Sequence, residues 1–246
     1  MTTTPWPYPR WIAHRGAGRL APENTLAAFR LGASHGYRMF ECDVKLSQDG
    51  VPFLMHDADL RRTTDGSGSG GEQAWQRLSQ LDAGSWHSRR YAGEGLPCLE
   101  NIARFCRHNG HLLNIEIKPT PGTERHTGEV VARHAARLWA NAAIAPLMTS
   151  FDIAALEGAQ ATAPALPRGL LLDKARADWL DTARQLACVA VVCHYSLWDT
   201  DTVAAAHGAG LRCLSYTVND EWIAHRLNTL GTDGIITDRI DLFSPA

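Results

Sequence analysis

The feature that most constrains the fold is a repeated alternation of short, apolar, β-branched runs with longer amphipathic stretches. The short runs are predicted to be strands at residues 11–14, 39–46, 112–118, 144–151, 168–173, 188–194, 212–218 and 234–238. The amphipathic stretches are predicted to be helices at residues 22–35, 99–108, 124–139, 152–161, 178–186, 199–207 and 220–230. Strands that alternate with helices pair in parallel, because each helix returns the chain to the edge where the next strand begins.

Eight strands in 246 residues favour a closed barrel over an open, doubly wound sheet, because one (β/α)8 barrel takes about 250 residues. We therefore predict an α/β protein with a (β/α)8 TIM-barrel fold, in which residues 1–246 form one domain. Another strand-like run, at 51–57, follows the second strand. We interpret residues 57–97 as a small insertion over one end of the barrel, and its glycine-rich run at 65–71 as a flexible loop or a lid.

Composition matters mainly for what it excludes. The 24 basic and 26 acidic side chains give a net charge of -2 without a basic block, which argues against a nucleic-acid partner. No apolar run approaches the roughly 18 residues of a membrane-spanning helix, so we expect no membrane insertion. Residues 1–10 do not resemble a secretory signal, and the six cysteines form no Cys-x-x-Cys pair. We expect reduced core thiols in a cytoplasmic protein, and the sequence indicates no oligomeric state.

Two neighbouring predicted strands carry acidic residues within their apolar runs. Glu41 and Asp43 are two residues apart and so share one face of their strand. Glu116 and Lys118 share a face of the next strand of the barrel. Buried barrel strands should be almost wholly apolar, and three uncompensated carboxylates are costly to bury. A hard divalent cation would neutralise them, Mg2+ first and Ca2+ or Mn2+ as alternatives. The other interpretation is a buried ion network in which the acids pair with Arg15 and Lys118.

Two histidines stand close to strand ends. His14 and His56 each end a short apolar run and precede a charged residue, Arg15 or Asp57. Histidine exchanges protons near neutral pH, so two of them at one reacting atom can serve as general base and general acid. A lone histidine at a strand end is more often structural, but two of them beside three carboxylates favour catalysis. Arg15 and Lys118 would suit the oxygens of a phosphoryl group.

Short motifs follow one another from residue 12 to residue 239. They are His14-Arg15-Gly16, Pro22-Glu23-Asn24-Thr25, Glu41-x-Asp43, Asp49-Gly50, His56-Asp57, Thr64-Asp65-Gly66, Leu96-Pro97-x-Leu99-Glu100, Glu116-Ile117-Lys118, Thr217-Val218-Asn219 and Asp233-Gly234-Ile235-Ile236-Thr237-Asp238. Each motif is weak alone. Their order and spacing together resemble the signature of the glycerophosphodiester phosphodiesterases, and most of all the short bacterial cytosolic members.

The resemblance implies hydrolysis of a small glycerophosphodiester, such as glycerophosphocholine or glycerophosphoethanolamine, to an alcohol and sn-glycerol 3-phosphate. It implies one divalent cation, with metal ligands Glu41, Asp43 and Glu116. His14 and His56 would be the acid–base pair, and we favour His56 as the acid. The attacking group would be water or the 2-hydroxyl of glycerol, the latter through a cyclic phosphate.

The remaining roles also come from the resemblance. Arg15 and Lys118 would bind the phosphate, and Glu23 would support the site or simply begin a helix. Tyr216 stands where the family usually has tryptophan, so it would line the pocket and change packing on the alcohol side. Tyr216 or Trp198 could face a choline cation. Arg239 follows Asp238 where the family soon has proline, which we expect to affect only the start of a last helix.

Two rival functions fit the same pattern. A lysophospholipase D or a phosphoinositide-type phospholipase on this scaffold would need an apolar rim, for which Trp86 and Tyr91 are candidates. A non-catalytic binding module would not need the full set of acid, base and metal positions. The fold alone does not decide between these functions.

Overall fold

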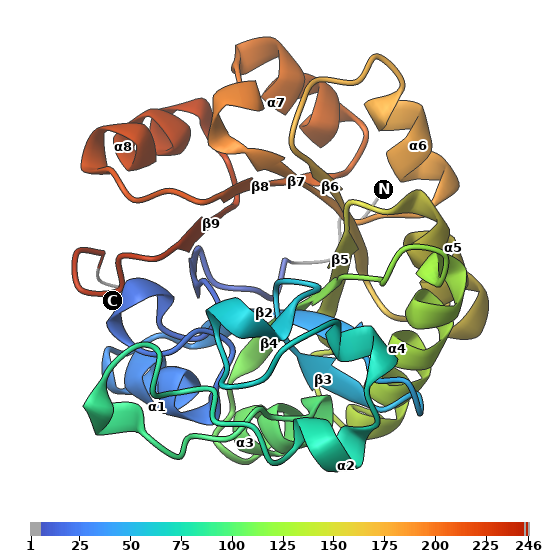
Figure 1. Cartoon of the computed structure of the whole chain (residues 1–246). Helices are drawn as coiled ribbons and strands as arrows, with labels where there is room; N and C mark the ends of the chain where they lie inside the picture. The colour runs from blue at the N-terminus through green and yellow to red at the C-terminus, as the bar shows by residue number, and fades with distance from the viewer. Residues whose placement is uncertain (1–5, 244, 246) are drawn as a thin grey trace.

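The structure is a computed structural model that describes residues 6–243 and 245. Within these residues, eight parallel strands form a closed barrel with helices around it (Figure 1). The barrel strands are β1 (Trp11–Ala13), β2 (Met39–Leu46), β4 (Leu112–Ile117), β5 (Leu147–Ser150), β6 (Arg168–Leu172), β7 (Ala190–His194), β8 (Arg212–Tyr216) and β9 (Gly234–Thr237). Strand β1 pairs with both β2 and β9, which closes the ring. The predicted TIM barrel and its eight strands are confirmed.

The predicted helices are also present. They are α1 (Leu26–Ser34), α3 (Leu99–His108), α4 (Glu124–Leu138), α5 (Ile153–Thr162), α6 (Trp179–Gln185), α7 (Thr200–Gly208) and α8 (Glu221–Leu230). Several begin at a side chain that accepts a hydrogen bond from a first-turn amide, as Thr25 does for α1 and Asp152 for α5. Among the described residues, no helix combines the length and the apolar content that a bilayer crossing requires.

Several predicted element boundaries differ from the structure, and the three largest differences are these. Helix α1 begins at Leu26 rather than at residue 22, because Asn24 adopts a left-handed conformation (φ +60°) that a helix does not accommodate. Strand β5 begins at Leu147 rather than at residue 144, and Pro146, just before it, has no amide hydrogen for pairing. After β9, residues 239–243 form a turn instead of the expected last helix.

The barrel interior divides into an apolar half and a polar half. Buried apolar side chains from several strands pack together toward the amino ends of the strands, among them Ile12, Met39, Leu171, Leu214 and Ile236. Because side chains alternate along a strand, the residue two positions further on lines the same wall nearer the carboxyl end. Of the residues at those positions, His14, Glu41 and Tyr216 line a cavity at this end of the barrel. On the other face of β2, Phe40, Cys42 and Val44 pack in one cluster with buried side chains of the surrounding helices.

The insertion after β2 has a small core of its own. It follows strand β3 (Pro52–Leu54), which pairs antiparallel with β2. It contains the 3-10 helices η2 (Leu60–Arg62), η3 (Gly70–Glu72) and η4 (Arg89–Tyr91) and the short helix α2 (Trp75–Leu78). The Glu94 carboxylate accepts from the amide of Ala27 at 2.9 Å, which ties the insertion to α1. Figure 1 shows the insertion on the side of the barrel formed by α1 and α3.

All six cysteines are free, and five of them are buried while Cys98 is half-buried. The expectation of core thiols therefore holds for five of the six.

Candidate active site

Three carboxylates from neighbouring strands meet at the carboxyl end of the barrel. The register places Asp43 beside Glu116, with Glu41 one pleat below on β2. One oxygen of each acid lies within 4.8 Å of the others. Glu41 and Asp43 are 2% and 1% exposed. The predicted metal ligands therefore form a cluster that can hold a metal ion through hard oxygen donors.

The contacts of the three acids distinguish a cation site from a network in which every acid is paired with a positively charged side chain. Asp43 Oδ2 lies 3.1 Å from Arg15 Nε, and Lys118 Nζ lies 3.7 Å from Asp43 Oδ1. Lys118 Nζ also donates to Glu116 at 2.9 Å. Glu41 receives only the amide of Arg15, at 3.0 Å, and its Oε1 is buried without a hydrogen-bond partner in the described structure. The cationic side chains thus account for Asp43 and Glu116, but they leave one buried oxygen that suits a cation.

Charge separates the two acids of β2. Burial raises the pKa of Asp43, but the Arg15 and Lys118 charges outweigh burial and hold that pKa below its ordinary value. Burial and the neighbouring charge of Asp43 raise the pKa of Glu41 well above its ordinary value. Burial and Asp43 likewise raise the pKa of Glu116, against the attraction of Lys118. Without a cation, the cluster therefore disfavours three ionised acids at once.

His14 is held by a carboxylate at the end of β9. Its Nδ1 lies 2.6 Å from Asp238 Oδ1, and its Nε2 lies 3.8 Å from Glu41 Oε2. Asn219 donates to Asp238 Oδ2 at 2.9 Å and so orients that carboxylate. Burial lowers the pKa of His14, but the bond to Asp238 and the charge of Glu41 outweigh burial and raise it. An ionised carboxylate only accepts, so Nδ1 carries the proton and Nε2 is left toward Glu41.

His56 is held in the same way from the insertion side. Its Nδ1 lies 2.7 Å from Asp57 Oδ1. Burial lowers the pKa of His56, and the nearby positive charge of Arg15 lowers it further. These effects outweigh the negative charge of Asp43, so the pKa of His56 lies below its ordinary value. These directions favour the proton on His14, which runs against our preference for His56 as the acid. A cation among the carboxylates would lower the pKa of both histidines by repulsion.

Two residues in left-handed conformations shape the loop after β1. Arg15 has φ +49°, and its amide faces Glu41 while its Nη1 donates to Glu23 at 2.9 Å. Asn24 has φ +60°, and its side chain donates to Asp43 Oδ2 at 2.8 Å and accepts from the Asp43 amide at 3.1 Å. Such backbone is uncommon outside glycine and concentrates at functional sites. Glu23 thus supports the site, and α1 begins three residues after it.

Seven of the eight predicted site residues line one cavity of about 170 Å³. They are His14, Arg15, Glu41, His56, Glu116, Lys118 and Tyr216. Asp43 is buried and contacts the lining through Arg15 and Lys118. Phe151 also lines the cavity, edge-on to Tyr216 with ring centroids 5.7 Å apart. Trp198 does not reach it: that side chain is 1% exposed in the outer layer and donates to the Leu214 carbonyl, so its predicted contact with a head group was wrong.

Sequence reasoning missed four residues that hold the site. Asn24 binds Asp43, Asp57 binds His56, Asp238 binds His14, and Arg62 binds Asp57. All except Arg62 stand inside the quoted motifs, and Asp57 directly follows its histidine. That adjacency was a usable signal, whereas the position of Arg62 depends on how the insertion folds.

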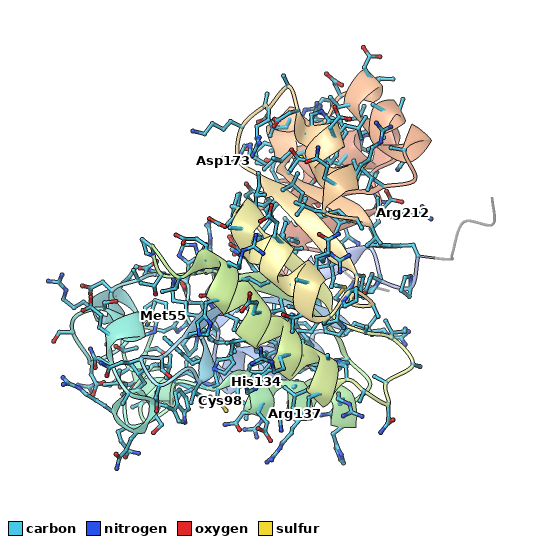
Figure 2. All side chains as sticks on the ribbon, turned by 90° about the vertical axis from the view of Figure 1, so that its right-hand side faces the viewer. Met55, Cys98, His134, Arg137, Asp173 and Arg212 are labelled. Carbon is cyan, nitrogen blue, oxygen red and sulfur yellow. The ribbon has the colours of Figure 1, made fainter. Side chains whose placement is uncertain are left out.

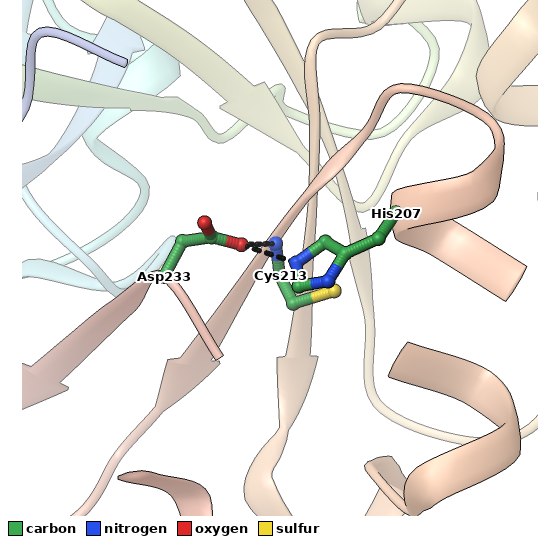
Figure 3. Close-up of side chains that lie close together, drawn as sticks. All are labelled: His207, Cys213 and Asp233. Carbon is green, nitrogen blue, oxygen red and sulfur yellow. Dashed lines mark hydrogen bonds and ion pairs between the residues drawn. The ribbon is translucent and has the colours of Figure 1, made fainter. Parts of the chain in front are cut away.

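A second group of possible metal ligands lies at the amino end of the barrel, where His207, Cys213 and Asp233 come together (Figure 3). Asp233 Oδ2 accepts from the Cys213 amide and contacts His207 Nε2, both at 2.8 Å, and Oδ1 accepts from Arg212 at 3.0 Å. In Figure 2, Arg212 lies at the end of the barrel opposite Met55 and Asp173. Both oxygens of Asp233 thus already have protein partners, which favours a structural role for this cluster over metal binding.

A larger cavity, of about 660 Å³, lies at the same amino end. Trp6, Tyr8, Ile144 and Leu211 are among its lining residues, and no carboxylate is among them in the described structure. Barrel enzymes place their chemistry at the carboxyl end, so the smaller cavity beside the acids is the better candidate site despite its size.

Comparisons with known proteins agree with this geometry. A model of the Glycerophosphoryl diester phosphodiesterase family matches residues 14–242. The glycerophosphodiester phosphodiesterase of Caldanaerobacter subterraneus is 29% identical over 231 residues, which cover 92% of this chain and 93% of that protein.

Solved structures are similar over the same length. An Oleispira antarctica phosphodiesterase in complex with the product sn-glycerol-3-phosphate is 35% identical, with a TM-score of 0.87 over 94% of this chain and 93% of that one. A glycerophosphodiester phosphodiesterase from Agrobacterium tumefaciens is 28% identical, with a TM-score of 0.80 over 97% of this chain and 100% of that one. Because the match runs from His14 through the last strand and so includes the whole acid cluster, this chain is an enzyme that belongs to the glycerophosphoryl diester phosphodiesterase family.

Proposed function

We propose that this enzyme hydrolyses small glycerophosphodiesters, such as glycerophosphocholine or glycerophosphoethanolamine, to an alcohol and sn-glycerol 3-phosphate. The observation that carries the proposal is the buried, unpartnered oxygen of Glu41 in a cavity that also holds two carboxylate-bound histidines and two cationic side chains. The solved relative that binds sn-glycerol-3-phosphate supports the choice of product.

Glu41, Asp43 and Glu116 would hold one divalent cation. We propose Mg2+, because the donors of the cluster are three carboxylate oxygens, which hard cations prefer. Ca2+ and Mn2+ also prefer oxygen donors and are the alternatives. When bound, the ion supplies positive charge at the phosphoryl oxygens.

The side chains of the chain itself divide the remaining work. Arg15 and Lys118 bind phosphoryl oxygens and hold the phosphorus in place. One histidine accepts the proton of the attacking hydroxyl, from water or from the glycerol 2-hydroxyl. The bond between phosphorus and the alcohol oxygen breaks, and the other histidine donates its proton to the departing alkoxide. Attack by the 2-hydroxyl would give a cyclic phosphate that water then opens.

Tyr216 and Phe151 form the aromatic wall of the cavity. The Tyr216 hydroxyl is already bonded to the Leu172 carbonyl at 3.0 Å, so the ring rather than the hydroxyl faces a ligand. We place the alcohol group against this wall. The cytoplasmic location stays a prediction from the sequence.

The decisive experiment is release of glycerol 3-phosphate from glycerophosphocholine, followed with a coupled dehydrogenase. The reaction is run in EDTA and then with Mg2+, Mn2+ or Ca2+ restored. We expect product only with a metal. Absence of product from the folded enzyme with every metal would contradict the proposal, and a panel of micellar lysophospholipids would then test the lipid-substrate alternative.

The same assay tests the two histidines. His14→Ala and His56→Ala should fold normally and each lose about 100-fold or more in kcat. A diester with a p-nitrophenyl leaving group, which departs without a proton, assigns the roles. It should restore activity to the variant that lacks the acid and not to the variant that lacks the base. Full activity of either variant on glycerophosphocholine would overturn the two-histidine scheme.

A further inference from the structure

One guanidinium group in the insertion binds two carboxylates at once. Arg62 Nη1 and Nη2 donate to the two oxygens of Glu23, both at 2.8 Å. On its other edge, Arg62 Nε and Nη2 donate to the two oxygens of Asp57 at 2.5 and 3.1 Å. Both pairings are bidentate, a geometry that arginine can make and lysine cannot. Arg62 therefore joins the loop after β1 to the loop after β3.

Each of these carboxylates holds a residue of the proposed site. Glu23 Oε1 accepts from Arg15 Nη1 at 2.9 Å. Asp57 Oδ1 lies 2.7 Å from His56 Nδ1. Arg62 is thus one side chain removed from a phosphate-binding residue and from one histidine of the acid–base pair, and it reaches both through carboxylates.

Charge makes this arrangement depend on Arg62. Glu23 Oε1 and Asp57 Oδ1 contact the same Nη2 atom, so without the guanidinium two negative groups would face each other. The hydrogen bond from Arg62 holds the pKa of Asp57 far below its usual range and keeps that carboxylate ionised. An ionised Asp57 accepts from His56 Nδ1, which leaves Nε2 as the nitrogen available for proton transfer.

We propose that Arg62 is a positioning residue for the reaction, which fixes the orientation and the tautomer of His56 and steadies Arg15. This inference rests on the proposed function, in which His56 moves a proton and Arg15 binds phosphate. It gives the insertion a part in turnover, because the short helix η2 carries a side chain that holds two residues of the site through their carboxylate partners.

The neighbouring arginine offers a matched control. Arg61 is in the same turn, is 75% exposed, and pairs with Asp59 of that turn. Arg62→Met should lower kcat about 10- to 100-fold, the cost of losing a residue that orients a reacting group. KM should change much less, because Lys118 remains and Arg15 keeps its contact with Asp43. Arg62→Lys, which keeps the charge but not the fork, should recover only part of the lost kcat. Arg61→Met should leave kcat unchanged.

A double-mutant cycle separates positioning from a general loss of stability. If Arg62 acts through Asp57, the pair Asp57→Asn and Arg62→Met together should be no slower than the slower single variant. A purely structural role would make the two losses in kcat multiply and would lower Tm in parallel. Tm is therefore measured for every variant, and kcat is referred to folded enzyme.

The outcomes distinguish this inference from the proposed function. An active parent enzyme whose Arg62→Met variant matches Arg61→Met in kcat would overturn the role of Arg62 alone. A multiplicative cycle with unchanged kcat in Arg62→Lys would do the same, because charge without the fork would then suffice. A parent enzyme that turns over no glycerophosphodiester would overturn the proposed function and this inference with it.

Discussion

At the scale of single residues, two acids on the same face of β2 differ in how well their oxygens are paired. Asp43 is paired with Arg15 and Lys118 and accepts a hydrogen bond from Asn24. Glu41 accepts one backbone amide, and within residues 6–243 and 245 its other oxygen is buried without a hydrogen-bond partner. A buried carboxylate with too few partners lowers stability unless it is protonated or binds a cation. Glu41 is thus retained at a cost to the metal-free fold, which is typical of a functional residue.

We expect Glu41→Gln to stabilise the metal-free enzyme by about 1 kcal/mol and to abolish metal-dependent turnover. Since the folded pKa of Glu41 is raised, its ionisation destabilises the metal-free parent as pH rises above about 4.3, and the variant lacks that loss. Thermal melts in EDTA across pH measure the difference. With Mg2+ restored, Tm should rise in the parent and not in the variant. A less stable variant in EDTA would contradict the argument.

The sequence predicted the side chains that meet at the cavity better than the residues that hold them in place. The spacing of Glu41 and Asp43 reveals their shared face because the strand period is two. No sequence spacing marks Asn24 in this way. Asn24 reaches Asp43 because its own backbone is left-handed, a conformation that tertiary contacts select. Asn tolerates that conformation better than most residues, but tolerance does not show where it is used.

At the scale of elements, α4 and α5 approach each other through two glycines. A Cβ atom on Gly128 would lie 1.9 Å from the Ala155 carbonyl oxygen, and one on Gly158 would lie 2.2 Å from the Arg125 carbonyl oxygen. Each helix thus presents a glycine to the backbone of the other. The alternation of strands and helices predicts that consecutive helices pack side by side. A glycine within a helix, however, predicts only a loss of helix stability until the segment that packs against it is known.

Gly128→Ala and Gly158→Ala should therefore each destabilise the enzyme by about 2 kcal/mol or more, because overpacking against backbone outweighs the gain of about 1 kcal/mol in helix propensity. Gly208 on α7 is the control, since a Cβ there meets no atom of the described residues within 4 Å. Gly208→Ala should be neutral or stabilising in urea unfolding. Equal effects at all three positions would refute the close-approach argument.

One carboxylate in the insertion, that of Asp82, accepts hydrogen bonds from several parts of its loop. Asp82 accepts from the Ser85 hydroxyl at 2.6 Å and from the amides of Gly84, Ser85 and Gly93, each at 2.8 Å. The Ser85 hydroxyl first, and then these amides, hold the pKa of Asp82 below its ordinary value. The stability that it contributes is therefore present above the unfolded pKa of about 3.9 and is lost as pH falls toward the lower folded value.

Hydrogen exchange tests this dependence on Asp82. The amides of Gly84, Ser85 and Gly93 should lose protection as pH falls below about 4, after correction for the intrinsic exchange rate. In Asp82→Asn that protection should already be low at pH 7. Glu72→Gln, a change at an exposed acid of the same insertion, should keep the parent profile. Unchanged protection in Asp82→Asn would mean that the loop is held by other contacts.

At the scale of the whole molecule, strand β9 separates two similar clusters for which we expect different roles. Asp233 precedes the strand and contacts His207 at 2.8 Å, while Asp238 follows it and contacts His14 at 2.6 Å. Both are Asp–His pairs, and four residues of buried strand lie between them. In barrel enzymes the amino end serves stability and the carboxyl end serves chemistry, so position in the fold decides the role of the pair.

The two aspartates therefore form a matched experiment. Asp233→Asn weakens the bonds to His207 and Arg212 and should lower the free energy of unfolding by about 1–3 kcal/mol, with kcat per folded enzyme unchanged. Asp238→Asn should lower kcat about 100-fold or more, because an amide no longer enforces the tautomer of His14, and should cost less stability. Urea unfolding and the glycerophosphocholine assay are run on both variants. If Asp233→Asn lost activity without losing stability, the chemistry would lie at the amino end and the assignment would be wrong. If instead Asp233→Asn loses stability and Asp238→Asn loses activity, the end of the barrel at which an Asp–His pair lies decides its role.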